Sequence, residues 1–112
     1  MKNKPPIETG PVTTERWQRL TLPQQLGAVG SEFSMYTLLL KKEALIDARK
    51  SLAEVLRLID LTILDGRWAG RVKDLTRFRK ILCDTTLGEN VHQQSVEKIQ
   101  DYLLSFALLA RK

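Results

Sequence analysis

Apolar residues recur every three or four positions along most of the chain, a spacing that places them on one face of an α-helix. The first such face consists of Leu22, Leu26, Val29, Phe33, Tyr36 and Leu40. Similar spacing continues over three further segments, which are 42–64, 68–86 and a last segment that ends near the C-terminus. No segment shows the sustained polar and apolar alternation of a half-buried strand. The pattern therefore predicts four helices and no strand.

Residues at the segment ends support these boundaries. Thr21 is suited to cap the first helix, and Gln24, three residues later, completes the pattern of a capping box. Gly88 is expected to end the third helix. Two starts are open for the fourth helix, because both Asn90 and Ser95 are good N-cap residues.

Four amphipathic helices joined by short turns pack by default as an up-down-up-down bundle. We therefore predict an all-α fold, with a four-helix bundle in residues 21–112. Three prolines and one glycine fall within the first 14 residues, which predicts that residues 1–20 form an extended N-terminal arm. Trp17 and Leu20 are expected to pack the end of this arm onto the core.

Small residues cluster on one side of the first predicted helix, at Gly27, Gly30, Ser31 and Ser34. Glycine inside a helix costs about 1 kcal/mol relative to alanine. Two glycines in one helix therefore suggest that another helix approaches closely at this position.

Apolar residues also lie away from the main core faces. They include Leu58 and Leu61 in the second helix, and Leu104 and Leu108 in the stretch "LLSFALLA". Large exposed apolar patches usually mark an interface, although the N-terminal arm is an alternative cover for them. We predict a homo-oligomer with the following interface residues: Gly27, Gly30, Ser34, Leu58, Leu61, Leu104 and Leu108.

The net charge of +5 is concentrated in the third helix, where "RWAGRVKDLTRFRK" carries six basic residues and one acidic residue. On a helix, Lys73, Arg77 and Lys80 share one outward face. Arg71 and Arg79 fall nearer the apolar face, where arginine packs its stem on apolar surface or pairs with an acid. The candidate acids for such a pair are Asp60, Glu32 and Asp101. We predict that Lys73, Arg77 and Lys80 contact RNA or DNA phosphates, with Arg71 and Arg79 as second choices.

The sequence offers little for catalysis or metal binding. Cys83 and His92 are the only residues of their types, which excludes an intrachain disulfide, a two-histidine zinc helix and a histidine-based triad from one chain. Glu89 and His92 have the Glu-x-x-His spacing of di-iron bundles, but the motif occurs once. The arginine that HEPN-type ribonucleases place shortly before their histidine is missing, and the acidic residues of 43–54 alternate with bases instead of forming a MazG-type magnesium cluster. We therefore expect no enzymatic activity, no metal and no cofactor.

No apolar stretch reaches the roughly 18 residues that a membrane span needs, and the N-terminal stretch lacks the apolar segment of a signal peptide. These features predict a cytoplasmic protein without a membrane partner.

The stretch "WQRLTLPQQLGAVGSE", together with "LIDLTI", "LCD" and "FALLARK", resembles small bacterial helical proteins of unassigned function. The residues that carry the resemblance are Trp17, Leu20, Leu22, Gln25, Leu26, Gly30, Ser31 and Glu32. In architecture alone, the predicted bundle is similar to ribosomal-RNA intervening-sequence proteins and to the accessory proteins of diversity-generating retroelements. The latter resemblance implies an oligomer that binds nucleic acid, although similarity of fold is not evidence of function.

Together these observations predict a non-catalytic, self-associating accessory or adaptor protein that binds RNA or DNA through a basic stripe on the third helix. The alternative is a protein–protein interaction module that uses its apolar helix surfaces and binds no nucleic acid.

Overall fold

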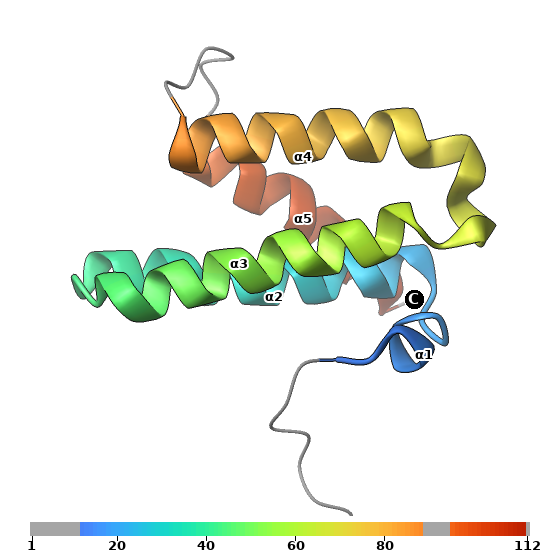
Figure 1. The fold of residues 1–112 in the computed structure, drawn as a ribbon, viewed down its shortest axis with the longest axis horizontal. Coiled ribbons are helices and arrows are strands. Elements are labelled where there is room, and N and C mark those ends of the chain that lie inside the picture. Colours follow the sequence, from blue (N-terminus) through green and yellow to red (C-terminus); the bar gives the residue numbers. More distant parts are fainter. Residues whose placement is uncertain (1–11, 89–94, 112) are drawn as a thin grey trace, which may run out of the picture.

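The computed structural model describes residues 12–88 and 95–111, and every regular element within these ranges is a helix (Figure 1). The elements are α1 (Thr14–Trp17), α2 (Leu22–Lys41), α3 (Leu45–Ile63), the 3₁₀ helix η1 (Gly66–Arg71), α4 (Val72–Leu87) and α5 (Val96–Ala110). The prediction of an all-α fold is confirmed. None of the described helices is both long and apolar enough to cross a membrane.

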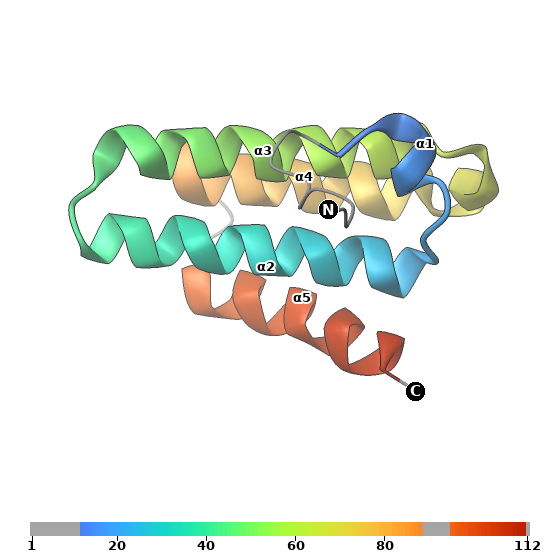
Figure 2. The ribbon, with the colours of Figure 1, turned by 90° about the horizontal axis from the view of Figure 1, so that it is seen from below.

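The helices α2 and α3 form an antiparallel hairpin that is the centre of the molecule (Figures 1 and 2). The helix α5 packs along the other side of α2, so that α2 has extensive contacts with two neighbours. The helix α4 lies beside α3 but contacts it far less than α2 does, and its contact with α5 is smaller still. The space between α4 and α5 is therefore the loosely packed side of the fold.

Two of the predicted helix starts are present in full. The Thr21 hydroxyl accepts a hydrogen bond from the backbone N–H of Gln24, and the Gln24 side chain accepts one from the backbone N–H of Thr21, at 2.8 Å. Ser95 caps α5, because its hydroxyl accepts from the backbone N–H of Lys98 at 3.0 Å. The other candidate cap, Asn90, lies outside the described residues.

Two other helix starts differ from the prediction by three or four residues. The helix α3 begins at Leu45 and not at residue 42, because Glu43 adopts a left-handed backbone with φ 59°. The helix α4 begins at Val72 and not at Trp68, which has non-helical angles inside η1. The 3₁₀ turn is held at its start by Asp65, whose side chain accepts a hydrogen bond from the backbone N–H of Arg67.

The predicted extended arm is wrong for its last part. Residues 14–17 form the short helix α1, which Thr13 caps by accepting from the backbone N–H of Arg16. Trp17 is buried in the core and Leu20 packs against it, as expected. Residues 1–11 of the predicted arm lie outside the described residues.

The core is an apolar layer where α2 faces α3 and α5, closed at one end by Trp17, and Leu75 and Leu82 of α4 also belong to it. Leu58 is only 4% exposed and belongs to this core, and Leu61 packs partly buried against it. The prediction that both leucines lie off the core face is therefore wrong for Leu58. The wide apolar arc of α3 is used by its two neighbours, since α2 and α4 pack on different sides of the helix.

A buried polar cluster ties the N-terminal segment to the turn before α4. The Trp17 indole N–H donates to the Thr62 hydroxyl at 2.9 Å, and the Trp68 indole N–H donates to the Gln25 side-chain oxygen at 3.0 Å. The Gln25 amide donates to the Trp17 carbonyl and to the Asp65 carboxylate. Because buried polar groups are costly without partners, this cluster fixes the start of η1 against α2 and the N-terminal segment.

Candidate nucleic-acid interface

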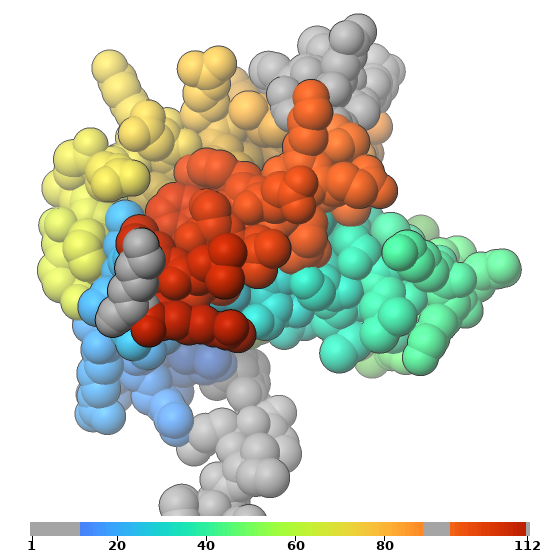
Figure 3. Space-filling model, turned by 180° about the vertical axis from the view of Figure 1, so that it is seen from behind, coloured from blue at the N-terminus to red at the C-terminus, as the bar shows by residue number. Residues whose placement is uncertain are grey.

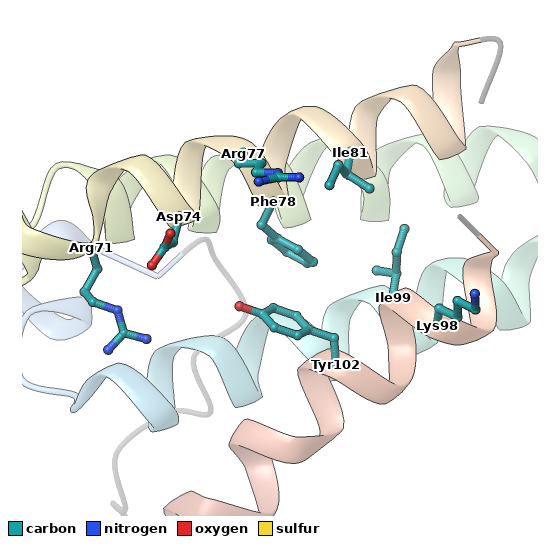
Figure 4. A pocket seen from close by; sticks show the side chains of 8 residues that line it. All are labelled: Arg71, Asp74, Arg77, Phe78, Ile81, Lys98, Ile99 and Tyr102. Atoms are coloured by element: carbon teal, nitrogen blue, oxygen red, sulfur yellow. The ribbon is translucent and has the colours of Figure 1, made fainter. Parts of the chain in front are cut away.

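A cleft of about 380 Å³ opens between α4 and α5 on the loosely packed side of the fold (Figure 4). Its volume lies within the usual range of small-ligand pockets. The side chains that line it are Arg71, Asp74, Arg77, Phe78, Ile81, Lys98, Ile99 and Tyr102.

The wall of the cleft is aromatic. Phe78 of α4 and Tyr102 of α5 face each other with ring centroids 4.9 Å apart and ring planes tilted by 34°. Phe106, one turn further along α5, supports Tyr102 edge-on at 5.2 Å. Tyr102 nevertheless remains 42% exposed.

The rim of the cleft is charged. Arg71 and Arg77 approach it from the α4 side and Lys98 from the α5 side, while Asp74 places one carboxylate among them (Figure 4). Burial raises the pKa of the Tyr102 hydroxyl above its usual value. Two smaller effects oppose each other, since the charge of Arg71 lowers this pKa and the charge of Asp74 raises it. The hydroxyl is therefore neutral at physiological pH and able to donate or accept a hydrogen bond.

The predicted stripe of Lys73, Arg77 and Lys80 lies exposed on α4. Within residues 12–88 and 95–111, none of these three side chains has an acidic partner at ion-pair distance, and the same is true of Arg71 and Lys98. Arg77 belongs both to the stripe and to the cleft. The cleft thus brings Arg77 of the stripe together with Arg71 and Lys98.

The other two basic residues of the run 67–80 are already paired. Arg79 binds Asp60 of α3 through two hydrogen bonds, Nε to Oδ1 at 2.7 Å and Nη2 to Oδ2 at 3.2 Å. Arg67 binds the buried carboxylate of Asp65 at 2.7 Å and stacks over the Trp68 ring at 4.6 Å. Structural pairing was expected for Arg71 and Arg79, with Asp60 among the possible partners. The pairing of Arg79 with Asp60 is confirmed. Arg67, and not Arg71, is the second paired arginine, because the 3₁₀ turn directs Arg67 toward Asp65 and leaves Arg71 at the cleft.

The glycine strip of α2 faces α5 of the same chain. A Cβ atom on Gly30 would lie 3.0 Å from Leu103 Cβ, and one on Gly27 would lie 3.1 Å from Ala107 Cα. The expected close approach of another helix is present, and it lies within one chain. Ser34 lies at the edge of this contact, in a small recess of about 90 Å³ between α2 and α5.

Two of the predicted interface leucines are exposed. Leu104 and Leu108 are 50% and 53% exposed on α5, the helix that forms one outer face of the molecule (Figure 3). Leu58 is not available for an interface because it is buried, as described above, and Leu61 is only partly exposed. Of the predicted interface residues, the leucines of α3 belong to or pack against the core, and the small residues of α2 contact α5 of the same chain. Leu104 and Leu108 are the two that remain exposed.

Cys83, the candidate reactive residue that the structure describes, does not line the cleft. Cys83 is partly buried on the side of α4 that faces α3, with its Sγ 3.7 Å from Arg79 Nη1. Glu89 and His92 lie outside the described residues. Among the residues that are described, no three His, Cys, Asp or Glu side chains are close enough together to hold a metal ion.

The sequence reasoning missed Lys98 and Tyr102 as site residues. They are four residues apart and so share a face of α5, but nothing in the sequence shows that this face lies opposite α4. Phe78 packs partly buried against the core and also lines the cleft.

Comparisons with protein-family models, with curated proteins and with solved structures found no match to this chain.

Proposed function

We propose that this protein is a non-catalytic, cytoplasmic accessory protein that binds nucleic acid through the exposed cations of α4. The observation that carries the proposal is the contrast within one basic run. Arg67 and Arg79 are neutralised by carboxylates, whereas Arg71, Lys73, Arg77 and Lys80 have no such partner in the described structure. Cations that are clustered and left unpaired repel one another, and a polyanion relieves that repulsion.

The spacing of the stripe suits a polyanionic chain. Lys73 and Lys80 are separated by about 10 Å of helix axis, at 1.5 Å per residue, with Arg77 between them. Each of the three side chains can neutralise a separate phosphate. Lys98 continues the positive surface onto α5, across the cleft from Arg77.

Salt dependence tests this proposal quantitatively. Each phosphate contact with a single strand contributes about −0.7 to the slope of log K against log[salt]. Three contacts from the stripe give a slope of about −2, and Arg71 and Lys98 extend it to about −3.5. Affinity for a labelled oligonucleotide, measured by fluorescence anisotropy, should fall roughly 20- to 130-fold between about 50 and 200 mM salt.

Two double charge reversals give a matched comparison. Lys73→Glu with Arg77→Glu should abolish binding without lowering the melting temperature, because both side chains are exposed. Arg49→Glu with Lys50→Glu changes the net charge equally on an exposed part of α3, and it should retain most of the affinity. Absence of binding at low salt, affinity that does not depend on salt, or equal losses in the two variants would each contradict the proposal.

The second candidate function is a protein–protein interaction module that acts by self-association. The observation in its favour is the exposed pair Leu104 and Leu108, which follow each other by one turn of α5. If these leucines join copies of the chain, light scattering should give a mass above the 12.8 kDa of one chain, and Leu104→Asp with Leu108→Asp should return it to that value. A wild-type protein that remains monomeric at high concentration contradicts self-association.

We also propose that α2, α3, α4 and α5 form an up-down-up-down four-helix bundle that is open between α4 and α5. The alternating direction of consecutive helices in Figure 1 supports this arrangement. The aromatic contact between Phe78 and Tyr102 supports α4 and α5 as neighbours.

A further inference from the structure

We infer that the cleft between α4 and α5 holds one unpaired nucleobase of a single strand, while the phosphates of that strand lie on Lys73, Arg77 and Lys80. This inference rests on the proposed nucleic-acid binding and specifies its substrate as single-stranded. It depends on the shape of the cleft, on its aromatic wall and on the distribution of charge around it.

In this proposal the cleft is the slot that takes a flat ring. Phe78 of α4 and Tyr102 of α5 point toward each other and provide π surface, and Ile81 and Ile99 lie beside them at the end nearer Lys98 (Figure 4). Proteins that bind single strands without strong sequence preference stack bases on exposed aromatic side chains of this kind. Tyr102 is the suitable platform, because its ring is partly exposed and is held in place by Phe78 and Phe106.

The charges around the slot distinguish a base from a bare phosphate. Asp74 lies at the end of the cleft toward which the Tyr102 hydroxyl points, close to Arg71 (Figure 4). A carboxylate repels a phosphate but accepts a hydrogen bond from the exocyclic amino group of a base. Arg71 and the neutral Tyr102 hydroxyl can donate to base carbonyl or ring-nitrogen acceptors.

Arg77 joins the two parts of the proposed site. It lines the cleft together with Phe78 and also belongs to the exposed stripe with Lys73 and Lys80. A base in the slot therefore places its own phosphate next to the stripe. In a duplex the bases are stacked and paired, so a base reaches the recess only after it is turned out, which costs a few kcal/mol.

Three labelled nucleic acids of equal length test the inference with the wild-type protein: a single-stranded oligonucleotide, a hairpin duplex and an abasic sugar–phosphate strand. Stacking of one base is worth about 1–3 kcal/mol. The single strand should therefore bind roughly 5- to 150-fold more tightly than the abasic strand at the same salt concentration. The duplex should also bind more weakly than the single strand.

Two substitutions of Tyr102 locate the effect. Tyr102→Leu keeps apolar volume but removes the ring. This variant should bind the single strand no more tightly than the abasic strand, and its affinity for the abasic strand should equal that of the wild type. Tyr102→Phe keeps the ring and should retain most of the affinity. Thermal melting monitored by circular dichroism confirms that both variants are folded.

The possible failures separate the two proposals. If none of the three nucleic acids binds at low salt, the proposed function is wrong. If all three bind equally and Tyr102→Leu has no effect, nucleic-acid binding stands and the base slot is overturned. If a free nucleoside monophosphate binds as tightly as the oligonucleotide, the slot takes a small nucleotide and the single-strand inference is also overturned.

Discussion

Adding one methyl group at Gly30 should destabilise this protein, although the same change stabilises most helices. The Cβ of an alanine at this position would lie 3.0 Å from Leu103 Cβ, whereas carbon atoms pack best at about 3.5–4.0 Å. Leu103 is fully buried, so it moves away only if α5 moves with it. The Gln100 side chain, which donates to the Gly30 carbonyl at 3.2 Å, would move as well.

The size of the effect follows from two opposing contributions. Replacing glycine by alanine inside a helix stabilises by about 1 kcal/mol, and overpacking a tight contact costs about 1–3 kcal/mol. We therefore expect Gly30→Ala to lower the free energy of unfolding by about 1 kcal/mol, and at most by about 2. Gly30→Leu should cost more, because the larger side chain has to separate α2 from α5.

Gly70→Ala is the matched control. A Cβ at Gly70 would meet no atom within 4 Å, and this residue does not have a positive φ. Alanine should therefore stabilise the protein by about 0.4–1 kcal/mol through the unfolded chain. Urea denaturation, followed by far-ultraviolet circular dichroism, should give midpoint shifts of opposite sign for the two variants. If Gly30→Ala raises the midpoint as much as Gly70→Ala does, the close contact between α2 and α5 is refuted.

Three further predictions follow from the polar contacts. The Arg67 side chain, with a smaller contribution from Gln25, lowers the pKa of Asp65 from 3.8 to about 2. The ionised Asp65 therefore stabilises the fold above about pH 4, and this contribution disappears as the pH falls toward 2. In urea titrations, Asp65→Asn should lower the free energy of unfolding by about 1–2 kcal/mol at pH 7 and by almost nothing at pH 2. Arg79→Gln should lower the free energy of unfolding by less than about 1 kcal/mol, because the ion pair of Arg79 with Asp60 is partly exposed. If Arg79→Gln and Arg77→Gln reduce oligonucleotide affinity equally, the separation of the basic run into paired and unpaired residues has no role in binding. Thr62→Val leaves the Trp17 indole N–H without its acceptor and should destabilise by about 1–3 kcal/mol in the same titration, whereas Thr76→Val at an exposed position of α4 should be near neutral.

Short-range features of the sequence were sufficient to predict the helical class and much of the helix layout. The capping pair of Thr21 and Gln24 is a local hydrogen-bond pattern, and it marks the start of α2 correctly. Ser95 does the same for α5. Apolar spacing predicted the core face of α2 from Leu22 to Tyr36, although it also included the exposed Leu40, and the glycines of that helix predicted a close neighbour. Such features depend only on residues within one or two helical turns.

The grouping of the basic residues was decided by tertiary structure. Helical spacing placed Lys73, Arg77 and Lys80 on one face, but it could not show that Arg67 would be paired and Arg71 left unpaired. That outcome depends on the 3₁₀ turn, which Asp65 holds and which is anchored through Gln25 to the N-terminal segment. The hydrogen bonds of Gln25 with Asp65 and Trp68 join residues about 40 positions apart, and a local sequence pattern cannot predict them.

The cleft likewise exists only in the folded chain. Its aromatic wall requires Phe78 and Tyr102 to meet across two helices, and its width results from the weak packing of α4 against α5. The burial of Leu58 has the same kind of cause, since α3 is covered by α2 on one side and α4 on another. Periodicity predicts which residues share a face of a helix, but what lies opposite that face is determined by the packing of the whole chain.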